Sequence, residues 1–131
     1  MTGVLGLKKY LNSKIHRVTV THADLDYEGS ITLPNYLLEA SGIAQYEAVC
    51  IWNVTQGTRL ETYAIPGSDE SQICINGAAA HLVAPKDIVI ISSFILLDSN
   101  QGIKHKPTVV FVDEHNNVKT ISDEVAGPKL R

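Results

Sequence analysis

Short alternating segments dominate the pattern of hydrophobic and polar positions along the chain. Residues 17–21 alternate and are rich in β-branched side chains, which is typical of a half-buried strand. Residues 48–54 are almost continuously apolar, so we expect a strand that is buried on both faces. The same criteria predict five more strands, at 59–65, 72–75, 87–97, 108–112 and 118–121.

The segment 59–65 carries chemically distinct residues on its two faces. Gln56-Gly57 marks a turn before it and predicts a hairpin with 48–54. Strand alternation then places Arg59, Glu61 and Tyr63 on one face and the residues between them on the other. A positively charged side chain and a phenol therefore share one surface.

Two short helices are predicted among the strands. Pro34 fits the start of the first helix and Gly42 the residue just past its end, with apolar residues at helical spacing between them. Residues 77–83 predict a second short helix before Pro85. Many short strands with only two short helices favour a mainly β fold that closes, or nearly closes, into a β-barrel without exposed sheet edges.

Composition indicates one ordinary globular domain. The chain has 131 residues, of which 44% are hydrophobic and 19% charged, and its net charge is -3 without a basic stripe, so we expect no nucleic-acid partner. The longest apolar stretch, 88–97, is shorter than the roughly 18 to 20 residues of a membrane span. Residues 1–7 lack the apolar core of a signal peptide, so we expect a cytoplasmic protein. We expect irregular tails, up to about Asn12 and from about Asp123.

The cysteines and histidines give no metal signature. Cys50 and Cys74 lie in apolar runs without C-x-x-C spacing, and we expect two buried, inert thiols. Three histidines and three nearby acids do not match zinc or calcium spacing, so no metal site is predicted. These six residues are His16, His22, His81, Asp24, Asp26 and Glu28.

A polar segment that ends in Gly29-Ser30 has two interpretations. It can be an ordinary turn, in which glycine supplies a positive φ and serine bonds the backbone. It can also be a site of backbone chemistry, because a Ser30 hydroxyl held against the preceding carbonyl can attack it and move the acyl group from nitrogen to oxygen. The segment alone leaves both open.

Arginine is scarce in the chain, and this makes its positions informative. Arg17 and Arg59 are the only internal arginines, and a guanidinium is the side chain best suited to hold a carboxylate by two hydrogen bonds. Each of them can equally be a partner for a surface acid. Arg59 is favoured as a binding residue because it shares a predicted face with Tyr63.

Six blocks occur in an order and combination that resemble a known family. The chain looks like the pyruvoyl-dependent aspartate alpha-decarboxylases of bacteria from about Lys14 to Asp113. The blocks are Lys14 to Leu25, Tyr27-Glu28-Gly29-Ser30, Ile51 to Thr55, Arg59, Thr62 to Ile65, and Asn76 to His81.

The resemblance implies a double-psi β-barrel with short helices that assembles as a homotetramer, with active sites between adjacent subunits. It also implies that the single domain 1–131 cleaves itself between Gly29 and Ser30 into chains 1–29 and 30–131. An ester forms, elimination leaves a dehydroalanine, and hydrolysis releases ammonia and leaves a pyruvoyl group at residue 30. This covalent cofactor condenses with the amino group of L-aspartate and accepts the electron pair left by carbon dioxide. The product is β-alanine, used for pantothenate and coenzyme A.

The resemblance also implies roles for individual residues. Tyr63, or a water that it orders, returns a proton to the α-carbon, and Thr62 bonds the oxyanion formed at Gly29. Substrate binding is implied for Lys14, Arg59, Asn76, Ala78 and Ala79, and supporting positions for His16, Tyr27 and Trp52.

The chain departs from the usual family pattern in places that touch no implied catalytic position. Pro85-Lys86 stands before Asp87, and Glu61 can pair with Arg59. Two alternatives stay open: a non-catalytic β-barrel that binds a small dicarboxylate, and a pyruvoyl decarboxylase for another acidic amino acid. An accessory maturation factor is also left open as a partner.

Overall fold

The computed structural model describes residues 6–128 and consists mainly of strands. The strands are β1 (Lys8–Thr19), β2 (His22–Asp24), β3 (Ser30–Pro34), β4 (Ala48–Asn53), β5 (Arg59–Gly67), β6 (Cys74–Asn76), β7 (Ile88–Leu97), β8 (Thr108–Val112) and β9 (Val118–Ile121). The helices are α1 (Asn35–Ser41), the 3₁₀ helix η1 (Gly77–His81) and α2 (Ser99–Lys104). The prediction of a mainly β fold with short helices is confirmed.

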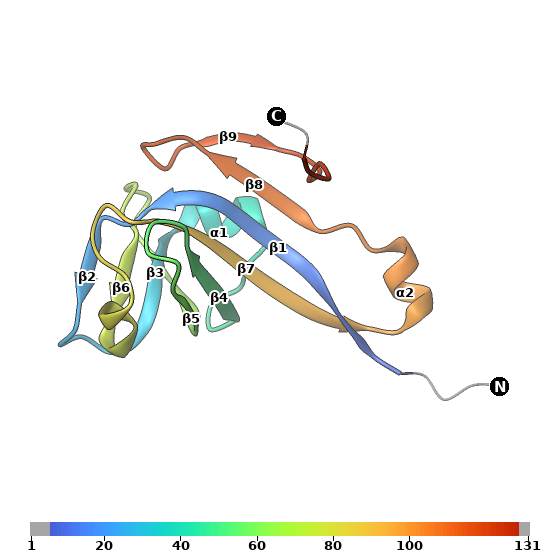
Figure 1. Ribbon diagram of the computed structural model, residues 1–131, viewed down its shortest axis with the longest axis horizontal. Coiled ribbons are helices and arrows are strands. Elements are labelled where there is room, and N and C mark those ends of the chain that lie inside the picture. Colours follow the sequence, from blue (N-terminus) through green and yellow to red (C-terminus); the bar gives the residue numbers. More distant parts are fainter. Residues whose placement is uncertain (1–5, 129–131) are drawn as a thin grey trace.

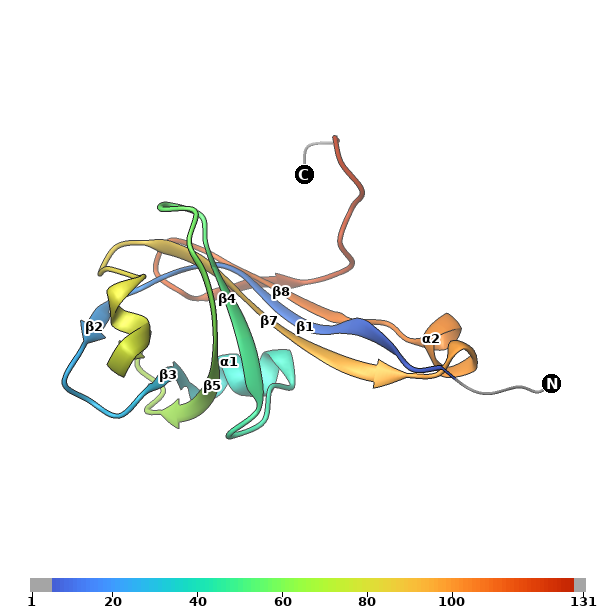
Figure 2. The ribbon, with the colours of Figure 1, turned by 60° about the horizontal axis from the view of Figure 1, so that its bottom comes forward.

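The strands form one sheet in the order β2-β6-β3-β5-β4-β7-β1-β8-β9. The long strands β1 and β7 run antiparallel across the molecule, and α2 lies at their far end (Figures 1 and 2). The short strands β2, β6 and β3 gather at the opposite end, next to η1 (Figure 1). Two kinds of region are thus joined, a long two-stranded arm and a cluster of short strands.

The core lies on one face of the central strands. Ile15, Ile91 and Ile51 stand side by side across β1, β7 and β4, and each is fully buried. Leu37 of α1 belongs to the same buried cluster. Burying one such side chain stabilises the fold by about 1.5 to 3 kcal/mol, so this row holds the central strands and α1 together.

The expectation that 48–54 is buried on both faces is wrong. In β4 buried and more exposed residues alternate, with Val49, Ile51 and Asn53 buried and Ala48 exposed. Cys50 and Trp52 are half-buried on the opposite face. The apolar run therefore serves two surfaces, a core face and an outer face that is open in the single chain.

The two predicted helices are confirmed and a third appears. Gly42 ends α1 with a φ of 77°, a conformation that glycine adopts without strain. The second predicted helix is a 3₁₀ turn, η1. The third, α2, begins with a capping box, in which Asp98 accepts from the Gln101 backbone N–H and the Gln101 side chain accepts from the Asp98 N–H.

The amino-terminal tail is more ordered than expected. Residues 1–5 and 129–131 lie outside the described part of the chain. Most of the segment assessed for a signal peptide, residues 1–7, therefore falls outside it. From Lys8 onward the chain is a strand, because β1 pairs with β7 from Lys8 opposite Leu97. Residues 122–128 form neither helix nor strand, as expected. Over the described range, none of the helices combines the length and the apolar character that crossing a bilayer requires.

Candidate active site

The bond between Gly29 and Ser30 lies where a loop becomes a strand. Ser30 is the first residue of β3 and is only 2% exposed, so the expected polar loop ends one residue earlier than its sequence suggests. The Ser30 hydroxyl accepts a hydrogen bond from Asn76 Nδ2 at 3.1 Å. Ser30 and Asn76 stand opposite each other in the β3–β6 pair, so the sheet register fixes this contact.

Gly77 brings the backbone of η1 against Gly29. A Cβ atom added to Gly77 would lie 2.6 Å from Gly29 Cα and 2.8 Å from Gly29 N, closer than side chains can pack. Gly77 also has a φ of 70°, which other residues adopt only with strain. Both the contact and the conformation therefore require glycine at 77, directly beside the Gly29-Ser30 bond.

Ser30 and Tyr63 line the same cavity, which we call the Tyr63 pocket. Its volume is about 290 Å³ and its lining includes Ser30, Tyr63, Tyr27, Glu28, Gln45 and Tyr46. The Tyr63 ring lies 6.2 Å from the ring of Tyr46, centroid to centroid. Sequence reasoning missed Tyr46 and Gln45, because they lie in a turn without periodicity and Tyr46 has a φ of 70°.

A second cavity, the Asn76 pocket, contains five of the residues to which the family resemblance assigns a role. Its volume is about 310 Å³. These five are Gly29, Thr62, Asn76, Ala78 and Ala79. Since Gly29 and Ser30 are adjacent in the chain, the Gly29-Ser30 bond joins this pocket to the Tyr63 pocket.

A polar network centred on the buried Asn53 and Asp87 holds the end of η1 in place beside these pockets. Asn53 Nδ2 and Thr58 Oγ1 both donate to the Leu82 carbonyl, at 3.2 and 2.7 Å. Asn53 Nδ2 also donates to Asp87 at 2.8 Å, and Gln56 Nε2 donates to the same carboxylate oxygen at 2.6 Å. The β4–β5 hairpin thus fixes the residue that follows η1, and with it the alanines of the Asn76 pocket.

Four other residues singled out from the sequence do not reach these pockets within one chain. Lys14 Nζ pairs with Glu124 Oε1 at 2.7 Å, and the His16 ring lies 5.4 Å from that of Phe111. Arg59 lies over the Trp52 ring.

Strand register places three of these four residues on one surface. One row of paired residues runs across β1, β7, β4 and β5 and consists of Lys14, Ser92, Cys50 and Glu61. Two residues further along β4 and two residues back along β5, the pair Trp52–Arg59 lies on the same face. The predicted face of Arg59, Glu61 and Tyr63 is confirmed, since all three are exposed. Arg59 and Tyr63 are four residues apart in β5, which corresponds to about 13 Å along the strand. The two side chains are therefore far apart although they share a face.

The cysteines differ from expectation. Cys50 and Cys74 are half-buried rather than buried: Cys50 lies on the less covered face of β4, and Cys74 is the least buried residue of β6. Partial burial raises the pKa of the Cys74 thiol, and a hydrogen bond with Thr21 opposes that rise. Among residues 6–128, histidine, cysteine and acidic side chains form no group of three or more that could hold a metal ion.

A buried serine hydroxyl, a phenol and an amide thus surround the Gly29-Ser30 bond at the start of a strand in a mainly β chain. The chain belongs to the aspartate decarboxylase family, whose model matches residues 7–119. It is 56% identical over 126 residues to the aspartate 1-decarboxylase of Legionella pneumophila (strain Lens), covering 95% of each chain. It is 54% identical over 121 residues to that of Myxococcus xanthus, covering 91% of this chain and 93% of the relative. The resemblance noted from the sequence is confirmed.

Proposed function

We propose that this protein is a carboxy-lyase that converts L-aspartate to β-alanine and carbon dioxide. Membership of the aspartate decarboxylase family supports this reaction. The single observation that carries it is the buried Ser30, which follows Gly29 and stands between the Tyr63 and Asn76 pockets. β-Alanine is a precursor of pantothenate and coenzyme A, so the enzyme works in the cytoplasm.

The chain first cleaves itself at Ser30. The Ser30 oxygen attacks the Gly29 carbonyl carbon, and the acyl group moves from nitrogen to oxygen as an ester. Loss of the Cα proton of residue 30 and breakage of its Cβ–Oγ bond then release Gly29 as a carboxylate that keeps this oxygen, and leave a dehydroalanine. The imine tautomer of this dehydroalanine is hydrolysed by water, which supplies the ketone oxygen and releases the nitrogen as ammonia. Thr62 lines the Asn76 pocket with Gly29 and is the donor to the oxyanion. One positioned donor of this kind contributes about 2.7 to 4 kcal/mol in other enzymes.

The products of cleavage are chains 1–29 and 30–131, with a pyruvoyl group at residue 30. Residue 30 fits such a group, because it is nearly fully buried, lines the Tyr63 pocket and faces the Asn76 amide. A pyruvoyl group supplies an electron sink for the electron pair left on the α-carbon when carbon dioxide departs.

The remaining residues bind and orient the substrate. Arg59 holds one carboxylate through two parallel hydrogen bonds, and Lys14 and the backbone near Ala78 and Ala79 hold the other. Asn76 contacts the substrate through its amide. Tyr63 returns the proton to the α-carbon, either directly or through an ordered water.

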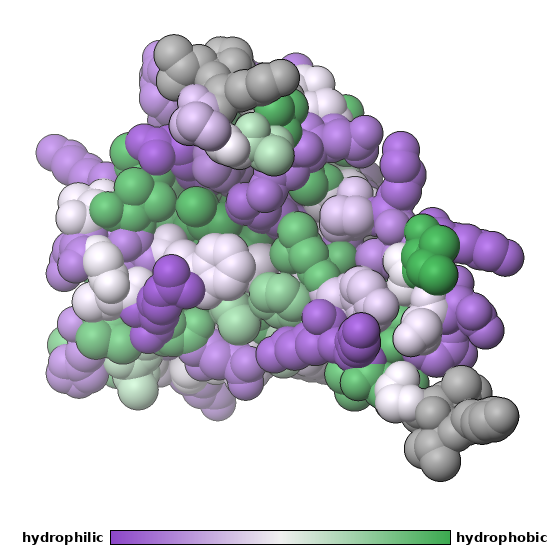
Figure 3. Space-filling view, turned by 45° about the vertical axis from the view of Figure 1, so that its right-hand side comes forward, coloured by the Kyte–Doolittle hydropathy of each residue, from purple (hydrophilic) through white to green (hydrophobic). Residues whose placement is uncertain are grey.

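Gathering these groups requires neighbouring subunits. Lys14, Trp52 and Arg59 lie away from the two pockets of their own chain, on an outer surface of the sheet, and His16 lies against Phe111 instead of lining either pocket. A homotetramer of double-psi β-barrels, with sites between adjacent subunits, brings this surface of one copy to the pockets of another. Apolar side chains also lie exposed on the molecular surface, among them Leu96 at 61% and Ile103 at 83%, and Figure 3 shows hydrophobic areas between hydrophilic ones.

Mass spectrometry tests the proposal. Purified protein incubated in the warm should give two chains of 29 and 102 residues, and a carbonyl reagent should label only the larger one. Ser30→Ala should stay intact, whereas Ser93→Ala, which alters another buried serine, should cleave normally. A wild-type chain that remains whole and only binds dicarboxylates would instead indicate a binding module.

Three further measurements complete the assignment. Cleavage that requires cell extract would reveal an accessory maturation factor. A panel of acidic amino acids tests aspartate as the substrate. Sedimentation of a fully active monomer at assay concentration would exclude the shared site.

A further inference from the structure

The side-chain amide of Asn76 is shared between two hydroxyl groups of β3. Asn76 Nδ2 donates to Ser30 Oγ at 3.1 Å and to Thr32 Oγ1 at 3.0 Å. Ser30 and Thr32 are two residues apart in the strand, so both side chains lie on the face that Asn76 meets from β6. Because an amide nitrogen carries two hydrogens, each hydroxyl takes one of them. Asn76 is 5% exposed, and this geometry defines its orientation.

One of the two acceptors is temporary. The inference rests on the proposed function, in which the Ser30 oxygen leaves with the carboxylate of Gly29. After cleavage the Asn76 amide has lost that acceptor, while Thr32 Oγ1 is unchanged by the chemistry. The hydrogen bond to Thr32 is therefore the contact that spans both states of the protein.

We propose that Thr32 is a positioning residue that holds the amide plane of Asn76, so that its second N–H points at residue 30 before and after self-cleavage. In the precursor this orients the Ser30 oxygen toward Gly29. In the mature enzyme it leaves a fixed donor at the reacting end of the pocket. Thr32 itself contacts neither Gly29 nor the substrate and acts through Asn76.

The conformation of Thr32 is fixed by a glycine on the neighbouring strand. A Cβ atom added to Gly67 would lie 2.8 Å from Thr32 Cγ2, so the threonine methyl packs where residue 67 has no side chain. β3 and β5 pair in parallel here, with Thr32 opposite Ile65. A β-branched side chain has few χ1 rotamers, and with its methyl against Gly67 the Thr32 hydroxyl faces Asn76.

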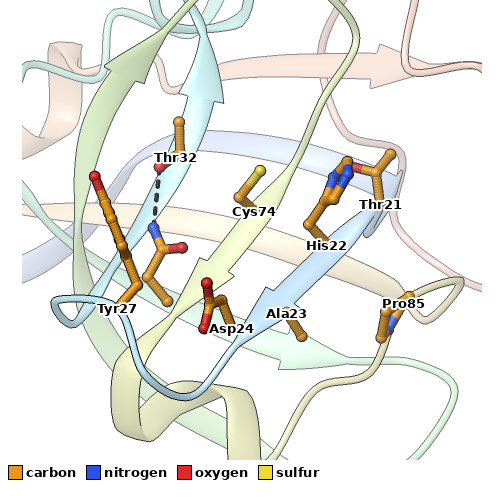
Figure 4. A pocket seen from close by; sticks show the side chains of 9 residues that line it. Thr21, His22, Ala23, Asp24, Tyr27, Thr32, Cys74 and Pro85 are labelled. Carbon is orange, nitrogen blue, oxygen red and sulfur yellow. Dashed lines mark hydrogen bonds between the residues drawn. The ribbon is translucent and has the colours of Figure 1, made fainter.

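Thr32 and Asn76 also border a third cavity, the Cys74 pocket, of about 500 Å³. Figure 4 shows Thr32 and Cys74 on its wall, with the hydrogen bond at the Thr32 hydroxyl drawn as a dashed line. This space can admit water, which could replace a deleted hydroxyl in a smaller variant. Thr32→Val keeps the volume of the side chain and removes the acceptor, so it is the informative substitution.

The kinetic test compares Thr32→Val with Thr32→Ser. Self-cleavage is followed by mass spectrometry, and kcat and KM for L-aspartate are measured on fully cleaved protein. We expect Thr32→Val to lower kcat/KM and the cleavage rate by about 3- to 10-fold, the range for one lost neutral hydrogen bond. Thr32→Ser, which keeps the acceptor, should remain within about twofold of wild type. Equal rates for the two variants would overturn the proposal.

A double-mutant cycle separates positioning from a general structural effect. In an Asn76→Ala background, Thr32→Val should cause no further loss of cleavage rate or kcat/KM, because the residue it acts through is absent. An additional loss of the same size as in wild type would show that Thr32 acts by another route. Gly67→Ala, which displaces the Thr32 methyl, should reproduce the Thr32→Val loss in the wild-type background only.

A spectroscopic readout does not depend on activity. In the uncleavable Ser30→Ala protein, Thr32 is the remaining acceptor seen for the Asn76 amide. Its two side-chain protons, observed by NMR after asparagine labelling, should exchange with solvent more slowly in Ser30→Ala than in Ser30→Ala with Thr32→Val. Equal exchange rates in the two proteins would refute the hydrogen bond between Asn76 and Thr32. That result would say nothing about whether the wild-type protein decarboxylates aspartate. A wild-type protein that does not decarboxylate aspartate would refute the function without affecting this comparison.

Discussion

The guanidinium of Arg59 lies over the indole ring of Trp52, with Cζ 5.3 Å from the ring centroid. The two residues are direct partners across the β4–β5 pair, so the contact is set by the register of the hairpin. A cation held over an aromatic face gains about 0.5 to 1 kcal/mol at an exposed site. The Arg59 side chain is thereby held over Trp52, while the carboxylate of Glu61 on the same face lies 4.0 Å from Cys50 Sγ.

Replacing Arg59 by lysine should leave self-cleavage intact and lower kcat/KM for aspartate at least tenfold. A lysine ammonium cannot form two parallel hydrogen bonds to a carboxylate, and it stacks less well on an indole. Steady-state kinetics on the fully cleaved variant measures the loss. Arg17→Lys is the matched control, since Arg17 is exposed at a strand irregularity of β1. An unchanged kcat/KM for Arg59→Lys would make Arg59 a surface residue only.

The carboxylate of Asp87 should make the fold sensitive to acid. Burial tends to raise the pKa of Asp87, but hydrogen bonds from the Ala84 backbone, Asn53 and Gln56 together lower it. A pKa that is lower in the folded state stabilises the protein above the unfolded value of about 3.9, and this stabilisation is lost as pH falls through the folded pKa.

Asp87→Asn should therefore lower the free energy of unfolding by about 1 to 3 kcal/mol at pH 7, because one buried oxygen no longer attracts three donors as an anion. The difference from wild type should be smaller at a pH below the lowered folded pKa than at pH 7, because the wild-type carboxylate is then protonated. Urea unfolding at both pH values measures it, with the exposed Asp69→Asn as control. A difference that is the same at both pH values would exclude ionisation as its source.

Local patterns predicted those features whose cause is local. Period-two alternation identified the face of Arg59 and Tyr63, and Pro34 with Gly42 identified α1 to within a residue at each end. The strands β2 and β3 were missed because they are short and pair with β6, more than 40 residues away. β2 has only three residues, and β3 begins inside the segment interpreted as a polar turn, so only the tertiary pairing identifies them as strands.

The residues of the two pockets show the same division between features with a local cause and features that depend on tertiary pairing. Ser30 and Gly29 were singled out from their own segment, whereas no local pattern places Thr32 or Tyr46 beside them. The Ser30–Asn76 contact depends on strand register between distant segments, which spacing alone does not determine. The family resemblance identified Asn76, whereas the fold shows that the Thr32 hydroxyl is the second acceptor of the Asn76 amide.

Gly102→Ala should destabilise the protein although it lies in a helix. Alanine normally stabilises a helix over glycine by about 0.5 to 1 kcal/mol. Here the added Cβ would overlap the phenol of Tyr10, which packs α2 against β1. Overpacking of this kind costs about 1 to 3 kcal/mol, so the melting temperature should fall. In a Tyr10→Ala background the same substitution should raise it, and a fall there would contradict the packing explanation.

Tyr63 is the residue whose loss should change the outcome of the reaction as well as its rate. Its phenol shares a pocket with Ser30, and its ring is placed beside that of Tyr46. After carbon dioxide leaves, a proton must reach the α-carbon of the substrate to give β-alanine. A proton delivered to residue 30 instead would transfer the amine and leave an alanyl end group, which inactivates the enzyme.

Tyr63→Phe should cleave itself normally, because the phenol is not needed for attack by Ser30. Its kcat should fall by about 10² to 10⁴, the usual contribution of a positioned general acid. Over many turnovers the 30–131 chain should accumulate the alanyl mass, whereas wild type should not. Tyr46→Phe removes the neighbouring hydroxyl and keeps both rings, so a mass change confined to Tyr63→Phe assigns the proton to Tyr63. Wild-type turnover with an unchanged mass in Tyr63→Phe would transfer this role to an ordered water.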